Sequence, residues 1–386
     1  MRTKIIFFFM FGIICLYTSC IQSFTPEVEK YEELLVVDGG ITDAPGPYTI
    51  KLSKSTRTQE LSKFIPYPGC KVVVEDDIGN EVIFYEHARG IYQTDSSAMK
   101  GIPGRKYKLH ISTPDGEDYE SVEETLLKPI AIQSVYAELQ HKSHPDLLYG
   151  RDGYQFYLDA ETPPTANNFL LWSLQCTYKF RTDFQIDAYY ANGRRNQVDN
   201  PDTLRTCYRT LDIVDIFILN TNMQNTQDIK HVALNYEDNY TKALSIRYSL
   251  KVQQYAINEA AFNYWNTIKK LRDMQGDLYT QQPYQAKNNL TNLKHPEKQA
   301  LGFFTVAGYT EKRIFVNPPG IADHYDICTI TGEPIKHLDD KLKLRPDLWP
   351  FFLVDPAQYK GDFWVDQDCM DCRRTGTLKK PDFWID

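Results

Sequence analysis

Residues 169–180 read FLLWSLQCTYKF, and this stretch decides the fold class of the chain. Apolar and polar side chains alternate along it, which is the period-2 pattern of a β-strand with one buried face. The stretch therefore predicts a strand, and Cys176 on its apolar face is either an inert buried thiol or a disulfide partner. The apolar face holds Leu170, Trp172, Leu174, Cys176, Tyr178 and Phe180, and the polar face holds Ser173, Gln175, Thr177 and Lys179.

Toward the N-terminus, residues 34–128 alternate short β-type segments with turn sequences such as Asp38-Gly39-Gly40 and Asp115-Gly116. About seven strands without a helical period predict an antiparallel, immunoglobulin-like β-sandwich. The expected strands cover residues 34–37, 48–52, 71–75, 81–85, 90–92, 106–111 and 119–122.

Lys128-Pro129 predicts a domain boundary, followed by a larger β-rich domain over residues 129–316. Residues 181–206 are polar and predict a long loop. Residues 317–386 predict a loop-rich C-terminal tail packed on the second domain. The fold class is therefore mainly β, and further strands are expected at 132–139, 155–159, 245–254, 302–307 and 313–316.

One substantial helix is expected at residues 258–275, inside the second domain. Asn258 is suited to cap its N-terminus, and Gly276 is suited to end it. We expect the helix to pack on a sheet face through Trp265, as part of the core. Its apolar residues at helical spacing are Ile257, Ala261, Trp265, Ile268 and Leu271.

The N-terminus predicts export and lipidation. Arg2 and Lys4 precede an apolar run from Ile5 to Leu16, which has the length of a signal-peptide core and is too short to span a membrane. The following Thr18-Ser19-Cys20 is suited to cleavage before Cys20 and to acylation of its thiol. We therefore expect a signal peptide at 1–19 and a lipidated tether at 20–33, with acyl chains holding the protein on a membrane. An ordinary secretory signal is the alternative.

The amino-acid composition indicates which classes of partner and activity to expect. A formal net charge of −8 without a strong basic cluster argues against nucleic acid. The 26 Tyr and 20 Phe fit half-buried β surfaces, although Tyr-rich surfaces also stack on sugar rings or bind peptides. Catalytic motifs are missing, and His141 and His144 lie in a loop before a proline. We therefore expect no enzyme and no cofactor, and the ligand is unknown.

The cysteines of the C-terminal tail form a group that could make disulfides or bind a metal. Cys328 is expected to pair with either Cys369 or Cys372, because exported thiols tend to oxidise. The remaining thiol stays free, pairs elsewhere with Cys207 as a candidate, or bonds to its own neighbour. The less favoured alternative is a metal site, in which zinc would bind His324, Cys328, Cys369 and Cys372.

Several long blocks of the sequence resemble one family, the Bacteroidota lipoproteins of domain-of-unknown-function family 4249. Cys70 departs from the pattern, because a small residue is expected there, which implies an unpaired thiol. The resemblance implies an outer-membrane lipoprotein, and it implies no catalytic residues. The matching blocks are 31–54 (YEELLVVDGGITDAPGPYTIKLSK), 255–271 (YAINEAAFNYWNTIKKL), 276–292 (GDLYTQQPYQAKNNLTN), 300–316 (ALGFFTVAGYTEKRIFV) and 369–384 (CMDCRRTGTLKKPDFW).

The resemblance also implies a function, because such lipoproteins are often encoded beside TonB-dependent receptors. We expect a non-enzymatic accessory or binding component of an outer-membrane nutrient uptake system, with the receptor as its partner. The face of the outer membrane, periplasmic or cell-surface, stays open. The alternative is a structural or assembly lipoprotein without a small ligand, and a hydrolase comes third.

Overall fold

The protein is represented by a computed structural model of the whole chain. The structure describes residues 33–55, 64–97, 99–144, 147–161, 169–192, 194–221, 229–274, 286–321, 324–330, 351–354 and 365–386. The predicted signal peptide and Cys20 lie outside the described residues, as does nearly all of the predicted tether. Among the described helices, none is long and apolar enough to cross a membrane.

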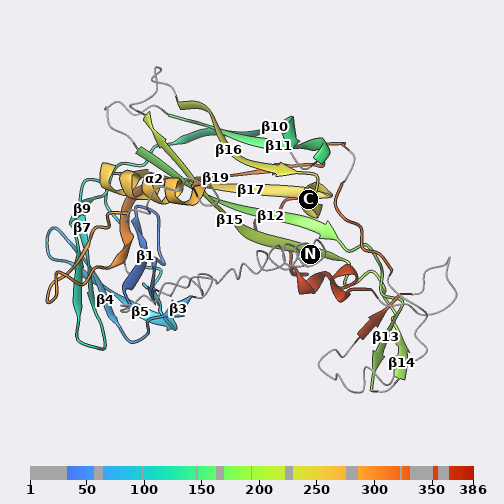
Figure 1. Cartoon of the computed structure of the whole chain (residues 1–386), viewed down its shortest axis with the longest axis horizontal. Coiled ribbons are helices and arrows are strands. Elements are labelled where there is room, and N and C mark those ends of the chain that lie inside the picture. Colours follow the sequence, from blue (N-terminus) through green and yellow to red (C-terminus); the bar gives the residue numbers. More distant parts are fainter. Residues whose placement is uncertain are drawn as a thin grey trace, which may run out of the picture.

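The fold is mainly β, as the sequence predicts, and one large sheet runs through both halves of the molecule (Figure 1). In spatial order its strands are β15 (Thr206–Asn220), β12 (Phe169–Arg181), β17 (Arg247–Ile257), β19 (Leu301–Val316), β1 (Leu35–Thr42), β2 (Thr49–Lys54), β6 (Ile91–Gln93), β5 (Glu81–Ala88), β4 (Lys71–Asp76), β7 (Lys106–Ser112), β8 (Asp118–Ser121) and β18 (Leu290–Asn292); β3 (Ile65–Pro66) pairs with β2, and β9 (Glu124–Thr125) pairs with β7.

The N-terminal half folds around a first core that includes Ile41, Ile50 and Leu109. All seven expected strands form, and the pairings among them are antiparallel. Strand β5 connects β4 to β6 within the sheet, because its first half pairs with β4 and its second half with β6. One expectation is wrong: Asp38-Gly39-Gly40 lies inside β1 and forms no turn.

The second half is a two-layer arrangement around a second core that includes Phe156, Trp172 and Tyr248. Its second layer is a separate sheet in the order β10 (Ile132–His144), β11 (Leu147–Ala160) and β16 (Ile229–Asp238). In Figure 1 this sheet lies over β12, β15, β17 and β19. The alternation predicted for 169–180 is confirmed, because all six apolar side chains of that face are buried in the second core.

Leu290, Ala300, Phe304 and Val306 belong to the first core, although sequence reasoning placed them in the second domain. Strand β18 pairs with β8, and the first half of β19 pairs in parallel with β1. The second half of β19 pairs with β17, so the two strands expected at 302–307 and 313–316 are one continuous strand. This long strand belongs to both halves, which local sequence patterns do not reveal.

The expected helix is α2 (Glu259–Asp273), and Asn258 caps it by accepting a hydrogen bond from the Ala261 backbone N–H. Gly276 lies outside the described residues. The helix packs on the sheet through Ala261, Phe262 and Tyr264, which cluster with residues of β12, β17 and β19. Trp265 is half-buried and belongs to none of the core clusters, so the expectation that it anchors the helix is wrong.

The region 181–206 contains a hairpin where a loop was expected. Strands β13 (Ala188–Ala191) and β14 (Arg194–Gln197) pair with each other, and β13 also pairs with β20 (Phe351–Leu353) of the tail. The polar composition hid the hairpin because its one buried face is completed by tail residues such as Phe352 and Val354. The remaining short helices are η4 (Lys242–Leu244), η6 (Gln367–Cys369) and η7 (Cys372–Arg374).

Candidate functional site

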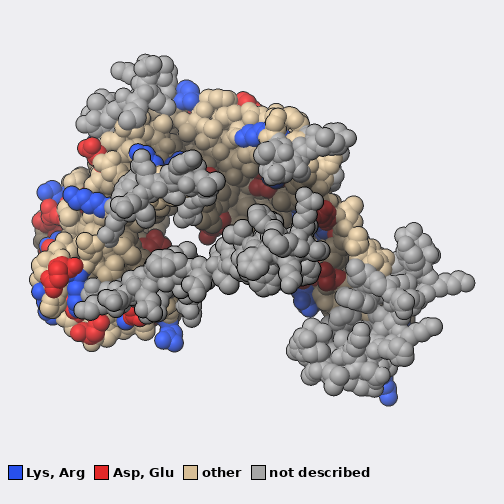
Figure 2. Space-filling model, in the orientation of Figure 1, with Lys and Arg blue, Asp and Glu red and all other residues tan. Residues whose placement is uncertain are grey.

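A pocket of about 670 Å³ lies where the two halves meet, and we call it the junction pocket. Strands of the large sheet form one side, while the β1–β2 loop and α2 contribute the others. Figure 2 shows the surface hollowed between the two halves, with acidic side chains around the hollow. The lining residues are Asp38, Gly39, Gly40, Ile41, Thr42, Ala44, Pro45, Pro47, Tyr48, Thr49, Leu171, Trp172, Ser173, Asp215, Ile216, Gln253, Tyr255, Trp265, Thr305, Tyr309 and Glu311.

Close approach of β1 to β19 shapes one side of the pocket. A Cβ atom on Gly40 would lie 2.0 Å from the Thr305 carbonyl oxygen, so this position in β1 excludes any side chain. The parallel pairing of Gly40 with Thr305 therefore requires glycine. The glycines read as a turn in the sequence instead bring two backbones together beside the pocket.

The β1–β2 loop is tied to the pocket wall. The Asp43 carboxylate accepts a hydrogen bond from the Tyr309 backbone N–H at 2.7 Å. The Tyr48 hydroxyl lies against the carbonyl oxygens of Thr42 and Ala44, which holds the loop back on β1. The Asp43 bond fixes the β1–β2 loop against β19, and the Tyr48 bonds fix the loop on β1, so this part of the pocket is preformed.

The part of the wall formed by β17 and β19 carries a connected row of aromatic and polar side chains. The Tyr255 and Tyr309 rings lie 5.3 Å apart between centroids. Gln253 donates a hydrogen bond to the Tyr309 hydroxyl at 2.9 Å, and that hydroxyl also bonds to Glu311. Burial raises the pKa of Tyr255 to about 12, and burial together with the Glu311 carboxylate raises the pKa of Tyr309. Both phenols therefore stay protonated at neutral pH.

Glu311 is the carboxylate at the end of this row. Its burial opposes ionisation, but hydrogen bonds from Lys251 and Tyr309 outweigh that effect and lower the pKa of the Glu311 carboxyl. Lys251 Nζ lies 2.7 Å from it. Glu311 is consequently ionised at neutral pH and is already paired with a cation.

Trp265 of α2 adds another aromatic ring to the pocket. Its indole N–H is buried and has no hydrogen-bond partner among the described residues, an arrangement that costs about 1–3 kcal/mol. Nearby, Asp215 of β15 forms an ion pair with Arg272 of α2, which ties the helix to the edge of the sheet. Trp265 is therefore held at the pocket by a helix fixed at both its N-cap and its last turn.

The lining combines aromatic rings, hydroxyl and amide groups and the three carboxylates of Asp38, Asp215 and Glu311. Among the described residues that line the pocket there is no histidine, cysteine, lysine or arginine. A hydroxyl nucleophile such as Ser173 therefore has no histidine or lysine beside it in the lining to act as a base. The arrangement of aromatic faces beside hydrogen-bonding edges is typical of small-molecule sites.

A second cavity of about 370 Å³ lies at another place, in the second half. Cys176 and Glu237 line it, together with Arg209 and Lys242. Burial raises the pKa of Glu237 to about 7, although a hydrogen bond from Thr241 opposes the shift. Cys176 is a buried free thiol, which decides between the two alternatives left open by the sequence.

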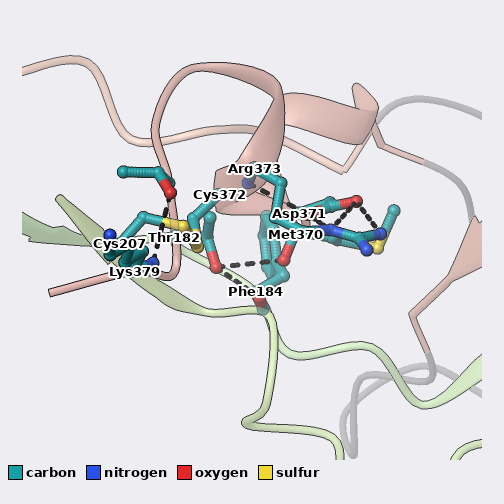
Figure 3. Close-up of a disulfide and its surroundings, with 9 residues drawn as sticks. Thr182, Phe184, Cys207, Met370, Asp371, Cys372, Arg373 and Lys379 are labelled. Atoms are coloured by element: carbon teal, nitrogen blue, oxygen red, sulfur yellow. Dashed lines mark hydrogen bonds and ion pairs between the residues drawn. A yellow bond between two sulfur atoms is a disulfide. The ribbon is translucent and has the colours of Figure 1, made fainter. Parts of the chain in front are cut away.

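The cysteine constellation forms two disulfides. Cys328 bonds to Cys369, with 6.0 Å between Cα atoms, and Cys207 bonds to Cys372, with 5.6 Å between them. The first is one of the two pairings left open by the sequence. Figure 3 shows the Cys207–Cys372 bridge beside Thr182, whose hydroxyl donates to the Met370 carbonyl at 3.2 Å. The Cys207–Cys372 bridge attaches the tail to β15, and the Cys328–Cys369 bridge joins two segments within the tail.

The alternative zinc site is wrong in this structure. The sulfur atoms of Cys328, Cys369 and Cys372 are all in disulfides, so they offer no thiolate ligand. The His324 ring instead stacks on Tyr240, with 5.6 Å between centroids. Within the described parts of the chain, no group of three or more His, Cys, Asp or Glu side chains is placed to hold a metal. Cys70 is a buried free thiol.

A comparison with known families identifies the family of the chain. The family described as a domain of unknown function (DUF4249) matches residues 21–313. The chain belongs to the DUF4249 family. The match covers both halves of this DUF4249 chain and every residue that lines its junction pocket. A search of curated proteins finds no match.

Sequence reasoning did not find the pocket of this DUF4249 member. Trp265 was assigned to the core, and Asp38 to a turn, while Tyr309 and Glu311 were not singled out. The available signal was the pair of glycines inside an otherwise β-type segment at 34–42, since glycine within a strand often marks a close backbone approach or a ligand site.

Proposed function

We propose that this DUF4249 chain is a non-enzymatic binding component of an outer-membrane nutrient uptake system. The observation that supports the proposal is the junction pocket, in which the rings of Tyr255, Trp265 and Tyr309 lie beside hydrogen-bonding groups. A pocket of this volume falls within the range of about 300–1,000 Å³ typical of small-ligand sites.

The proposed location in the cell follows from the N-terminal sequence. Cleavage before Cys20 and acylation of its thiol would anchor the protein in the outer membrane of a member of the Bacteroidota, by two or more acyl chains such as palmitate. The acidic tether at 20–33 would separate the lipid from the folded part. A TonB-dependent receptor is the proposed partner, and the protein would pass a nutrient to it or hold it at the receptor.

Affinity purification from the native membrane tests the proposal. The intact protein, tagged at its C-terminus, is purified from detergent-solubilised outer membrane, and co-purifying proteins are identified by mass spectrometry. We expect a TonB-dependent receptor in near-stoichiometric amount, and none with Cys20→Ala, which should not reach the membrane. Tyr85→Ala, at an exposed position far from Cys20 in sequence, is the matched control.

The same experiment separates the alternative. Enrichment of envelope assembly proteins without any TonB-dependent receptor would favour a structural or assembly lipoprotein and would contradict the uptake proposal.

A further inference from the structure

The junction pocket carries formal charge of one sign. Its lining includes the carboxylates of Asp38, Asp215 and Glu311, and its described lining residues include no lysine or arginine. A phosphate or carboxylate ligand would bring a fourth negative charge into the pocket. The lining offers such a ligand no cationic partner, so the pocket disfavours anions.

Each of these carboxylates already has a cation beside it, contributed from outside the lining. The pairs are Asp38 with Lys51 at 3.9 Å, Glu311 with Lys251 at 2.7 Å, and Asp215 with Arg272. A cationic ligand would have to compete with these side chains for the same charge. A ligand hydroxyl that donates a hydrogen bond needs only one free lone pair on the carboxylate. An ionised carboxylate has about four such acceptor positions, so it can bind its cation and a hydroxyl together. The paired acids therefore favour neutral hydrogen-bond donors.

The aromatic residues supply flat apolar surface in the same space. Trp265, Tyr255 and Tyr309 come from three different elements and line one pocket. The faces of Trp and Tyr rings provide large, rigid contact area, while their edges remain polar. A ligand that fits has an apolar ring face and a polar circumference.

Further polar groups surround these rings. Gln253 is held in place by its hydrogen bond to the Tyr309 hydroxyl, and Ser173 is exposed on the neighbouring strand β12. Thr305 lines the pocket from β19. Fixed amide and hydroxyl groups of this kind both donate and accept, which matches hydroxyl groups on a ligand.

We infer that the junction pocket binds a neutral, polyhydroxylated ring, the chemistry of a carbohydrate. One face of such a ring presents C–H groups that pack on Trp265 and the tyrosines, and its hydroxyls bond to the paired carboxylates and to Gln253. This inference rests on the proposed binding function and deepens it by naming the chemical class of the ligand.

Binding of the mature, unlipidated chain to an array of neutral glycans tests the inference. Hits are then titrated by calorimetry, with choline as the cationic probe and inorganic phosphate as the anionic probe. We expect at least one neutral glycan to bind, with one site per chain, and neither choline nor phosphate to compete for it. Trp265→Ala should weaken glycan binding at least tenfold, and Tyr85→Ala, which removes an exposed aromatic ring away from the pocket, should not.

Glu311→Gln distinguishes a hydroxyl ligand from a cation, because it removes the charge and keeps an acceptor oxygen. A glycan should lose less than about tenfold in affinity, whereas a cation bound through this carboxylate should lose more. Thermal unfolding of each variant establishes that it is folded.

Three outcomes overturn the inference: no glycan on the array binds, glycan binding survives Trp265→Ala in the folded variant, or only choline binds. Recovery of a TonB-dependent receptor together with any of these would leave the proposed function standing and remove the ligand class alone. Pocket-dependent glycan binding without recovery of a receptor would support the ligand class and contradict the proposed partnership with a TonB-dependent receptor.

Discussion

Asn289 is joined to Phe304 by two hydrogen bonds that imitate the pairing of neighbouring strands. Its side-chain amide donates to the Phe304 carbonyl at 2.9 Å and accepts from the Phe304 N–H at 3.0 Å. Asn289 is 4% exposed, so both bonds are buried. The Asn289 side chain therefore satisfies the hydrogen-bonding groups of Phe304 on the edge of β19 that faces away from β1.

Replacing Asn289 with alanine should lower the free energy of unfolding by about 2–4 kcal/mol, because the Phe304 N–H and carbonyl lose their partner while buried. Urea denaturation followed by tryptophan fluorescence measures the change. Asn263→Ala, on the exposed side of α2, is the matched control and should stay within about 0.5 kcal/mol of the wild type. Equal effects of the two substitutions would show that the Asn289 bonds contribute little.

Glu237 should make stability fall as pH rises. Burial raises the pKa of its carboxyl from 4.5 to about 7, so between these values the folded state binds more protons than the unfolded state. Its contribution is complete below pH 4.5 and is lost as pH passes 7, by about 3 kcal/mol at most. Glu237→Gln removes this dependence.

The measurement for Glu237 is the difference in unfolding free energy between wild type and Glu237→Gln from pH 4.5 to 8. The wild type should lose stability relative to the variant across this range. Because carboxylates with lowered pKa, such as Asp371, change stability in the opposite direction at lower pH, only the difference is diagnostic. A constant difference would contradict the raised pKa of the Glu237 carboxyl.

The two disulfides should differ in their contribution to stability. Cys207–Cys372 joins residues 165 apart in sequence, and Cys328–Cys369 joins residues 41 apart. Loop-closure entropy then gives the longer link roughly 1 kcal/mol more, on a base of about 4 kcal/mol. Calorimetry of the paired substitutions Cys207→Ser/Cys372→Ser and Cys328→Ser/Cys369→Ser measures both losses, and the reverse order would refute the entropic account for this chain.

Cys70 and Cys176 should be free but unreactive in the folded protein. Both are buried, and burial raises the pKa of the Cys70 thiol to about 11, which leaves almost no thiolate at neutral pH. Without reductant, iodoacetamide should label neither cysteine until denaturant is added, and should then label both. Peptide mapping that finds Cys70 or Cys176 in a disulfide would contradict the structure.

Lipidation at Cys20 is tested by intact mass. The membrane-extracted protein should begin at Cys20 and carry the mass of a diacylglycerol and an amide-linked acyl chain, while Cys20→Ala should retain residues 1–19. A mature chain that begins near this position without acyl groups would indicate an ordinary secretory signal.

Local patterns account for most of the secondary structure. The period-2 alternation at 169–180, the short strands of 34–125 and the Asn258 cap each depend on residues that are neighbours in sequence, so they could be predicted. The hairpin at β13 and β14 could not, because its apolar face is completed by residues from the tail, more than a hundred positions later.

The sequence by itself determined that the chain is mainly β, where its principal helix begins, and which cysteines of the tail were available to pair. Only the tertiary structure decided that β19 is shared by both halves, that Cys328 bonds to Cys369, and that Asp38, Trp265 and Tyr309 meet in one pocket. The reason is physical: strand and helix patterns arise from contacts within a few residues. The junction pocket arises from a parallel pairing between strands some 260 residues apart, whose register is set by burial in two cores at once.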